Sequence, residues 1–343
     1  MSPGLMSPEV PEMSTDQVRK DYQTKNRIIK ECLADPQKGK HLNESMASTI
    51  KREVYGHSLA RVLLAPKLVD KGHCPVFEET PDGPVVMINL VQQEKRVLSC
   101  RAFRDSLREE ETVTSIRDID FVVMRGQAIR PVSFPISNVC TLRLPDLNGD
   151  SFNRVERSRQ RMLRSLATDE TSIVIRALSW VCRRFGRKSW APFSGGWSCR
   201  AAITDSINRI GKERNPVIVS SLSTMTEIAG LKPVEPPSDT ESVSVFPMKA
   251  MAIDGRDYPV YHCDSIPDWA IFVIPSGESL GQMPIFIEPN ILDYDKPERL
   301  IKGWLCYQDQ GVVFVNVRLT NTVYVGLRGL LEMVKNFFRL WNS

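Results

Sequence analysis

The feature that most constrains this chain is a helical pattern that runs from residue 151 to residue 184. Apolar side chains recur along this stretch at helical spacing, so one face of the predicted helix packs against the rest of the protein. The Asn-Gly-Asp-Ser of residues 148–151 turns the chain and caps the helix. The polar residues 168–171 mark a place where the helix could break and be capped again. The sequence therefore predicts a spine-like helix to which other elements attach.

The same helix carries the sharpest charge feature of the chain. Between Arg154 and Lys188 basic residues recur, and only Glu156, Asp169 and Glu170 oppose them. Such a patch attracts phosphate through charge and counterion release, without reading base sequence. Salt bridges to neighbouring acidic loops are the alternative use of these side chains. The residues predicted to contact phosphate are Arg154, Arg157, Arg161, Arg164, Arg183 and Arg184.

Length and composition are those of a soluble globular protein. The 343 residues suffice for one large domain or two ordinary ones, with 42% hydrophobic and 25% charged residues. Because the net charge is only +4, any contact with nucleic acid has to come from a local basic patch. The N-terminus lacks a signal-peptide pattern, and no stretch approaches the ~18 apolar residues of a membrane span. We expect a soluble, intracellular protein without membrane contact.

Common motifs for bond chemistry are missing from the sequence, including a phosphate-binding loop, a nucleophile elbow and a zinc-protease helix. The eight cysteines include no Cys-x-x-Cys pair, and the four histidines lack the spacing of zinc ligands. Scattered thiols of this kind are typical of buried structural cysteines in a reducing compartment. We therefore expect no enzymatic activity, no cofactor and no metal. A soluble α/β enzyme with an unrecognised site is the more distant alternative.

The first half of the chain combines helices with a long β excursion. Helices are predicted for residues 16–35 and 43–64. Residues 74–111 are predicted to form a two-stranded excursion, with a turn at residues 80–83 between its first two strands. A hairpin this long needs a partner surface, because so few of its residues can be buried locally. That need favours assembly, and a β-rich stretch over residues 113–144 follows.

The second half mixes short helices and strands. Residues 311–316 and 319–325 are predicted to pair as strands, and residues 326–341 to form an amphipathic helix. Docking of this helix onto its own domain or a neighbouring subunit is favoured over membrane contact. Before these elements, helices are expected at residues 197–210 and 221–229, and strands at residues 242–253 and 258–262.

A block over residues 268–325 contains several soft motifs in close order. An apolar strand leads into a loop with Gly-Gln-Met-Pro at residues 281–284, and an acidic turn follows at residues 293–297. Gly303-Trp304 and a Gly-to-Asn run over residues 311–316 complete the block. None of these residues suggests bond chemistry, so the block is expected to place surfaces.

This order of elements resembles the major capsid protein of tailed bacteriophages of the Hong Kong 97 type, a fold shared with encapsulin nanocompartments. The late block, with its Gly-x-Met-Pro, acidic turn and Gly-Trp, is similar to one found in that family. The resemblance implies an α+β fold with an N-terminal arm, an extended β-hairpin E-loop, a spine-helix P-domain and an α/β A-domain. The boundaries it implies are residues 1–42 for the arm and first helix, 43–71 for a helical segment, 72–111 for the E-loop, 112–189 for the P-domain with its spine at 151–184, 190–310 for the A-domain, and 311–343 for the P-domain return strands and C-terminal helix.

The resemblance also implies a function. It predicts a major capsid protein that self-assembles as hexamers and pentamers into an icosahedral shell around viral double-stranded DNA, in a virion assembled in the host cytoplasm. A separate scaffolding protein and a portal are the implied partners, and DNA would be held by non-specific contact. An encapsulin-like compartment for protein cargo is the close alternative. The E-loop residues that it implies in contacts between subunits are Val85, Met87, Lys95 and Arg96.

Overall fold

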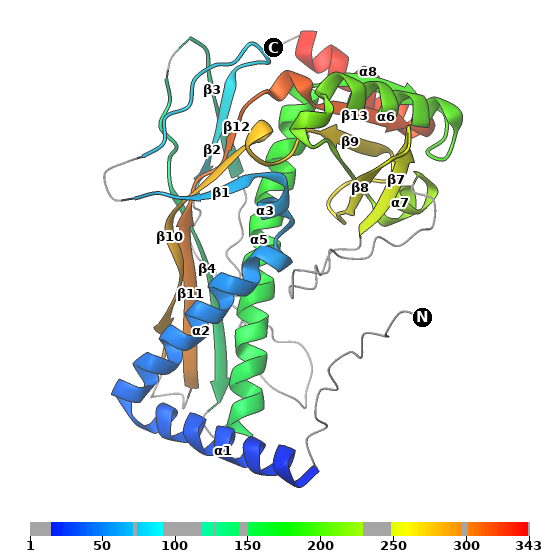
Figure 1. The fold of residues 1–343 in the computed structure, drawn as a ribbon. Helices are drawn as coiled ribbons and strands as arrows, with labels where there is room; N and C mark the ends of the chain where they lie inside the picture. Colours follow the sequence, from blue (N-terminus) through cyan, green and yellow to red (C-terminus); the bar gives the residue numbers. More distant parts are fainter. Residues whose placement is uncertain are drawn as a thin grey trace, which may run out of the picture.

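The computed structural model describes residues 15–70, 74–91, 118–126, 128–143, 150–228, 248–295 and 301–341. Within these residues the fold is α+β, with two sheets attached to one long helix, α5 (Ser151–Arg184) (Figure 1). The 34 residues of α5 span about 51 Å at a rise of about 1.5 Å per residue. The helix continues without a break through residues 168–171, where the sequence had suggested an interruption.

Three helices precede the first sheet: α1 (Thr15–Ala34), α2 (Pro36–His57) and α3 (Leu59–Leu63). The sequence predicted the second helix to begin near residue 43, which is wrong. It begins at Pro36, because the Asp35 carboxylate accepts a hydrogen bond from the Gln37 backbone N–H at 2.9 Å. Proline at the first helical position loses no hydrogen bond there, so Asp35-Pro36 both ends α1 and starts α2.

Helix α1 closes the N-terminal end of α5. The Asp150 carboxylate caps α5 through the Asn153 backbone N–H and also accepts a hydrogen bond from the Tyr22 hydroxyl. The Asn26 side-chain oxygen accepts from the Phe152 backbone N–H at 3.1 Å. Two of the N–H groups that a helix start leaves unpaired are therefore satisfied, one of them by a residue from another helix. The hydrogen bond from the Tyr22 hydroxyl to Asp150 lowers the pKa of the Asp150 carboxyl and raises the pKa of the Tyr22 hydroxyl.

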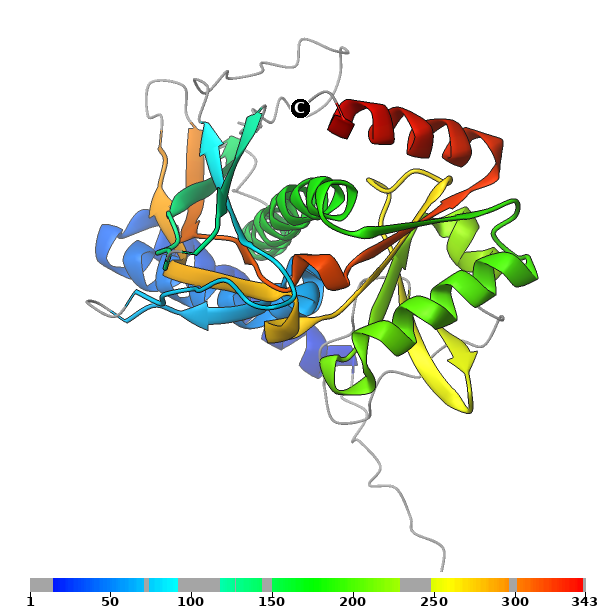
Figure 2. The ribbon, with the colours of Figure 1, turned by 90° about the horizontal axis from the view of Figure 1, so that it is seen from above.

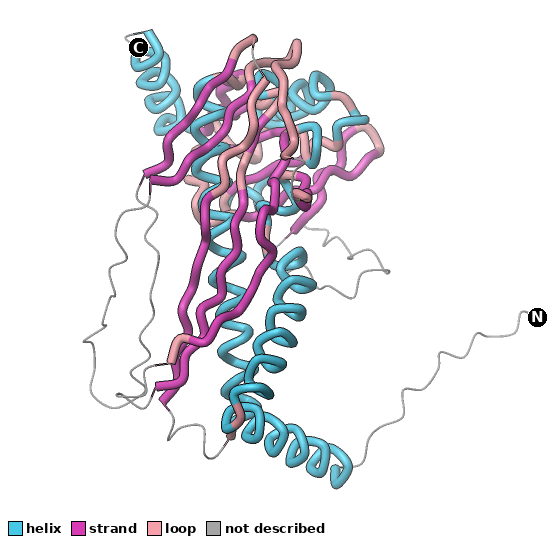
Figure 3. The backbone as a smooth tube through the Cα atoms, turned by 90° about the vertical axis from the view of Figure 1, so that its left-hand side faces the viewer, coloured by secondary structure: helices cyan, strands magenta, loops and turns pink. Residues whose placement is uncertain are grey.

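The first sheet lies along α5 and α2, and its longest strands run side by side down the molecule (Figure 3). Its strand order in the described residues is β3-β2-β12-β10-β11-β4, with β1 parallel to β10. The strands are β1 (Ala65–Leu68), β2 (Val85–Val91), β3 (Asp118–Met124), β4 (Phe134–Arg143), β10 (Gly281–Asp293), β11 (Ile301–Gln310) and β12 (Val313–Phe314).

Two pairings in this sheet differ from the sequence prediction. Strand β2 pairs with β3 along its whole length, whereas Phe77 forms an isolated bridge with Ile129. The predicted turn at residues 80–83 is present, closed by hydrogen bonds between Thr80 and Gly83. The return of the excursion predicted over residues 96–103 lies outside the described residues.

The Gly-Gln-Met-Pro of residues 281–284 begins strand β10 and is not a loop, which corrects the sequence prediction. Gly281 is needed because β12 passes very close: a Cβ there would lie 2.0 Å from the Val313 carbonyl oxygen. Glycine thus serves a close strand contact here and does not mark a chain break.

The second sheet has the order β5-β13-β9-β6-β8-β7 in the described residues. Helices α6 (Trp197–Ile210) and α8 (Gly326–Trp341) both contact β5 and β13 and lie on opposite sides of them (Figure 2). Their bounds confirm the sequence prediction. The other elements are β5 (Arg187–Ala191), β6 (Val217–Ser220), α7 (Leu222–Ile228), β7 (Met248–Ile253), β8 (Arg256–His262), β9 (Ala270–Ile274) and β13 (Asn321–Val325).

The two strands predicted to pair late in the chain lie in different sheets. Strand β12 pairs with β10 and β2, whereas β13 pairs with β5 and β9. A short 3-10 helix, Val317–Leu319, carries the chain between the two sheets. Strands β10 and β11, which fall in the predicted A-domain range, lie in the first sheet beside β4.

A buried polar cluster joins α3, α5 and the first sheet. The Arg61 guanidinium donates to the Glu170 carboxylate at 2.7 and 3.0 Å, and its side chain is 2% exposed while that of Glu170 is 0% exposed. The Gln308 side chain of β11 accepts from Arg61 at 3.0 Å and donates to Glu170. The Tyr55 ring covers the guanidinium at 4.8 Å. Because buried charges are tolerated only when they are paired, this cluster permits one register among the three elements.

Replacing one partner of this cluster tests its role. We expect Arg61→Met to lower the free energy of unfolding by about 3–5 kcal/mol, since it leaves the Glu170 carboxylate buried and unpaired. The double change Arg61→Met with Glu170→Met should cost less than the single change. Urea unfolding followed by circular dichroism measures both.

The exposed pair Arg187–Asp205, at 2.9 Å, provides the control. Arg187→Met should lower the free energy of unfolding by about 1 kcal/mol or less. A double Arg61/Glu170 variant as unstable as Arg61→Met alone would contradict the assignment.

Candidate functional site

Four of the predicted phosphate-contacting arginines share one face of α5. Arg154, Arg157, Arg161 and Arg164 follow the spacing i, i+3, i+7 and i+10, which places them in one stripe. Arg157 and Arg164 are exposed, and the other two are half-buried. The last three line an open groove of about 560 Å³ together with Glu156, Gln160, Ser165, Thr168 and Asp169. We call these four arginines the cationic stripe.

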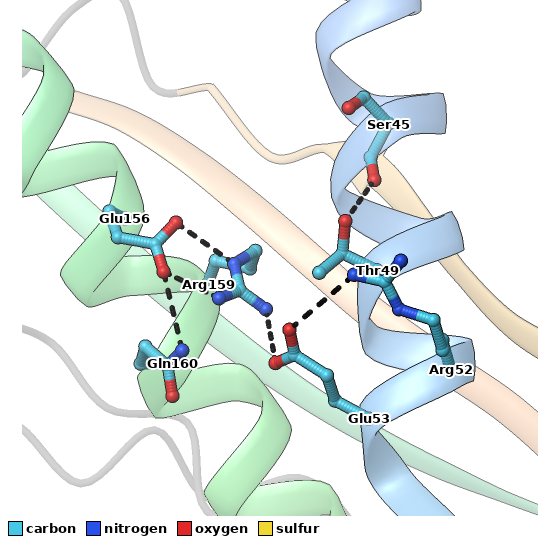
Figure 4. Close-up of polar contacts among 7 residues, drawn as sticks. All are labelled: Ser45, Thr49, Arg52, Glu53, Glu156, Arg159 and Gln160. Carbon is cyan, nitrogen blue, oxygen red and sulfur yellow. Dashed lines mark hydrogen bonds and ion pairs between the residues drawn. The ribbon is translucent and has the colours of Figure 1, made fainter. Parts of the chain in front are cut away.

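A neighbouring arginine takes up the acidic charge that would otherwise oppose the stripe. Arg159 lies on the inner side of α5, where it donates to Glu156 at 3.0 and 2.5 Å and to Glu53 of α2 at 2.7 Å (Figure 4). Hydrogen bonding from Arg159 lowers the pKa of the Glu156 carboxyl and fixes it as an anion. Since Arg159 neutralises this carboxylate, cations dominate the groove. For Arg159, the alternative use of the basic residues, in salt bridges to acidic side chains, is therefore correct.

The remaining two arginines do not belong to the same surface. Arg183 and Arg184 are exposed in the last turn of α5, some 40 Å along the helix axis from Arg157 at about 1.5 Å per residue. Arg183 and Arg176 instead line a largely apolar cavity of about 480 Å³ between α5 and the two sheets. The six predicted residues therefore form two separate clusters.

Stacked aromatic rings build the walls of this cavity. Phe121 of β3 stacks on Trp180 of α5 at 4.0 Å, and Trp269 stacks on Tyr324 of β13 at 6.1 Å. Thr322 also lines the cavity, and its buried hydroxyl has no hydrogen-bond partner among the described residues. The cavity thus lies between β3 at the edge of the first sheet, the C-terminal part of α5, and strands β9 and β13 of the second sheet.

The predicted E-loop contacts are placed only in part. Val85 and Met87 are buried within the chain itself, in a small core with Phe77, Ile129 and Val313. The chain therefore already covers both side chains. Lys95 and Arg96 lie outside the described residues.

An exposed aromatic pair at the start of α6 was missed by the sequence reasoning. Phe193 is 73% exposed and Trp197 is 85% exposed, at the end of the second sheet. Exposed apolar patches mark interaction sites, which makes this pair a candidate contact surface. The signal available in the sequence was two aromatic residues flanking a Gly-Gly turn.

The cysteines that the structure describes are reduced, and most are buried. Burial raises the pKa of Cys182, Cys199 and Cys306 to about 12 each, so these thiols stay protonated at neutral pH. Within the described ranges no cluster of three metal-ligating side chains occurs. None of the helices in the described part of the chain is long and apolar enough to cross a bilayer.

The cationic stripe predicts salt-dependent binding of DNA. We expect Arg157→Gln, Arg161→Gln and Arg164→Gln together to weaken binding of short duplexes irrespective of their sequence. The slope of log K against log salt should fall by about 2–3, because each phosphate contact contributes about 0.9. Fluorescence anisotropy across a salt series measures this slope.

A matched variant removes the same charge from scattered exposed sites, with Arg27, Arg256 and Arg318 changed to Gln. It should change the slope much less. Equal effects from both triple variants would show that the stripe is not a binding surface.

The carboxyl of Asp169, at the end of the groove, is expected to make the stability of the fold depend on pH. Burial raises the pKa of its carboxyl from 3.8 to about 6, and the charge of Glu170 adds to the shift. The folded state thus favours the protonated acid, so stability falls as pH rises from about 4 to about 6. We expect Asp169→Asn to raise the free energy of unfolding at pH 7 by about 2 kcal/mol, and by less at pH 4.5. Urea unfolding at the two pH values checks this, with the exposed Asp70→Asn as the control.

No family model matches the chain, and no curated protein matches it either. Among solved structures, the chain is similar to a virus-like particle from Pyrococcus furiosus at 10% identity, with 82% of this chain and 98% of that chain covered and a TM-score of 0.46.

Two phage structures are also similar. The mature capsid of bacteriophage PhiM1 matches at 10% identity, with 79% of this chain and 87% of that chain covered and a TM-score of 0.41. Mycobacterium phage Cain matches at 6% identity, with 78% and 90% covered and a TM-score of 0.43. These three structures are of two phages and of a virus-like particle.

Proposed function

We propose that this chain is a shell subunit that assembles with copies of itself into an icosahedral capsid around double-stranded DNA. The observation that carries the proposal is the exposure of large apolar side chains at separate places on one continuous framework. Phe193 and Trp197 are exposed at the second sheet, and Val122 and Val123 on the edge strand β3 of the first. Exposed apolar patches on a protein surface mark sites where other molecules bind.

The position of these surfaces favours a closed assembly of many copies. The apolar side chains of β3 and those before α6 belong to different sheets, so one neighbour meeting a single patch would leave others uncovered. Different patches that meet each other give head-to-tail contacts, which close into rings or shells when the rotation permits. The spine helix supports such contacts because it links the two sheets as one unit.

Within this proposal the spine helix and the first sheet form the P-domain, and the second sheet forms the A-domain. The A-domain then comprises residues 187–274 and receives β13 and α8 from the end of the chain. The segment between β2 and β3, which lies outside the described residues, would be the E-loop. The cationic stripe would face the interior, where charge without base readout suits a packaged polyanion.

Electron microscopy of the purified chain tests the proposal. We expect uniform icosahedral particles, together with nuclease-protected DNA in particles isolated from their natural source. Particles that enclose protein cargo in place of DNA would identify the chain as a subunit of an encapsulin-like compartment. A chain that stays monomeric at high concentration would overturn the proposal of a shell, whether the shell encloses DNA or protein.

A substitution in the exposed aromatic pair, Phe193 and Trp197, tests whether this surface takes part in assembly. Trp197→Glu should abolish particles while leaving the circular dichroism spectrum and thermal unfolding of the subunit unchanged, because the side chain is 85% exposed. Trp197→Phe keeps an apolar ring and should retain assembly. Normal particles from Trp197→Glu would remove this residue from the interface.

A further inference from the structure

The apolar cavity beside Trp180 has room for a ring from another molecule. Its volume of about 480 Å³ lies in the range of sites that bind drug-sized ligands. Ser265 and Pro267, which also line it, are exposed, so the cavity opens to the surface. Its walls include two stacked aromatic pairs, and ring contacts in stacked or edge-to-face geometry stabilise more than area burial alone. The cavity therefore favours an aromatic side chain as its occupant.

Arg183 gives this cavity a positive charge. Its Nε donates to the Ser179 carbonyl at 2.9 Å, and none of the ion pairs in the described part of the chain includes Arg183. The described lining residues include one further arginine, Arg176, which already has a contact within the chain, and no carboxylate. The terminal nitrogens of the Arg183 guanidinium can therefore receive a carboxylate from outside the chain.

The aromatic pair Phe193 and Trp197 offers rings to such a cavity. The Gly196 backbone N–H donates to the Phe193 carbonyl at 3.3 Å, which closes a tight turn just before α6. Both rings leave the protein from this one turn, because Phe193 is 73% exposed and Trp197 85%. Tryptophan and arginine are the side chains that most often carry the binding energy of an interface.

Glu227 of α7 adds a negative charge beside the aromatic pair. A Cβ at Gly195, between the two rings, would lie 3.9 Å from the Glu227 Cβ. Within the described ranges Glu227 takes part in no ion pair. The nearby cation Arg200 instead donates to the Ala252 carbonyl at 2.6 Å. The surface thus combines two exposed rings with an unpaired carboxylate, which complements an aromatic cavity that contains an unpaired guanidinium.

The aromatic pair and the cavity cannot meet within one chain. Helix α6 packs on the face of β13 that carries Val323, whereas Thr322 and Tyr324 on the opposite face line the cavity. Figure 2 shows the start of α6 at the outer end of the second sheet and β3 on the other side of α5. A second copy of the chain can supply the rings, and each copy has one pair and one cavity. Contacts of this kind run head to tail and close into a ring when the rotation permits.

We propose that Trp197 of one copy inserts into the cavity beside Trp180 of the next copy, and that Glu227 of the first copy pairs there with Arg183 of the second. This inference rests on the proposed function, because it names the two surfaces through which shell subunits meet.

Photocrosslinking within assembled particles tests the contact. Benzoylphenylalanine replaces Trp197, and isotope-labelled chains are mixed with unlabelled chains before assembly. We expect mass spectrometry to find position 197 of one isotope joined to residues 176–184 or 265–272 of the other. The same photoreactive side chain in place of Ile28 on α1, which is 49% exposed, should not reach these residues. Crosslinks from position 197 that lie only outside the cavity lining would overturn the proposal.

Exchange of the two charges provides a second test. Arg183→Glu and Glu227→Arg should each raise the protein concentration needed for half-maximal assembly at least about tenfold. The two changes together restore the pair in reverse and should bring that concentration back to within about threefold of the unchanged chain. Arg183→Glu with Glu278→Arg, which alters an exposed acid elsewhere, should give no recovery. If the exchanged pair assembles no better than the single variants, the contact is disproved.

The shell and the contact fail in different ways. A chain that forms no particles would overturn both. Particles whose crosslinks from position 197 reach other surfaces of the neighbouring copy, or a copurified protein, would overturn the contact alone and leave the shell intact.

Discussion

The buried pair of Arg61 and Glu170, completed by Gln308, is the interaction on which the rest of the structure depends. Its three members come from α3, α5 and β11, which are far apart in the sequence. A shift of one residue along any of these elements would leave a charge buried without a partner, at a cost of several kcal/mol. Apolar packing alone tolerates such shifts better, because one aliphatic side chain can replace another. The cluster therefore selects one arrangement of helix and sheet.

That arrangement determines what α5 can present at its two ends. Near its start, Arg159 faces inward to Glu53 of α2 and leaves the cationic stripe on the outer side. Near its end, Gly186 lets the chain pass the Thr320 side chain, since a Cβ there would lie 2.5 Å from the Thr320 hydroxyl oxygen. The chain then enters β5 parallel to β13. An uninterrupted helix keeps these two regions at a constant distance.

Helical periodicity predicted α5, α6 and α8 with their bounds, because the signal for a helix is contained within the helix itself. Strand partners could not be predicted in this way. Strands β12 and β13 are adjacent in the chain yet belong to different sheets, since their partners β2 and β9 come from earlier segments. The basic run from Arg154 to Lys188 was predicted as one patch, but its arginines form two clusters, and the inward turn of Arg159 depended on Glu53. Phe193 and Trp197 stood out only once their exposure was known.

Helix α8 shows a further limit of periodicity, which reveals that a helix has an apolar face but not where that face points. Docking onto its own domain was expected and is confirmed, since α8 contacts β13 and β5 and Asn336 donates to the Tyr324 hydroxyl. The second sheet is consequently enclosed by two helices that each leave apolar side chains outside, Trp197 at the start of α6 and Leu331 on α8. The two helices lie on opposite sides of the same strands (Figure 2). One neighbour cannot readily cover both surfaces of this sheet.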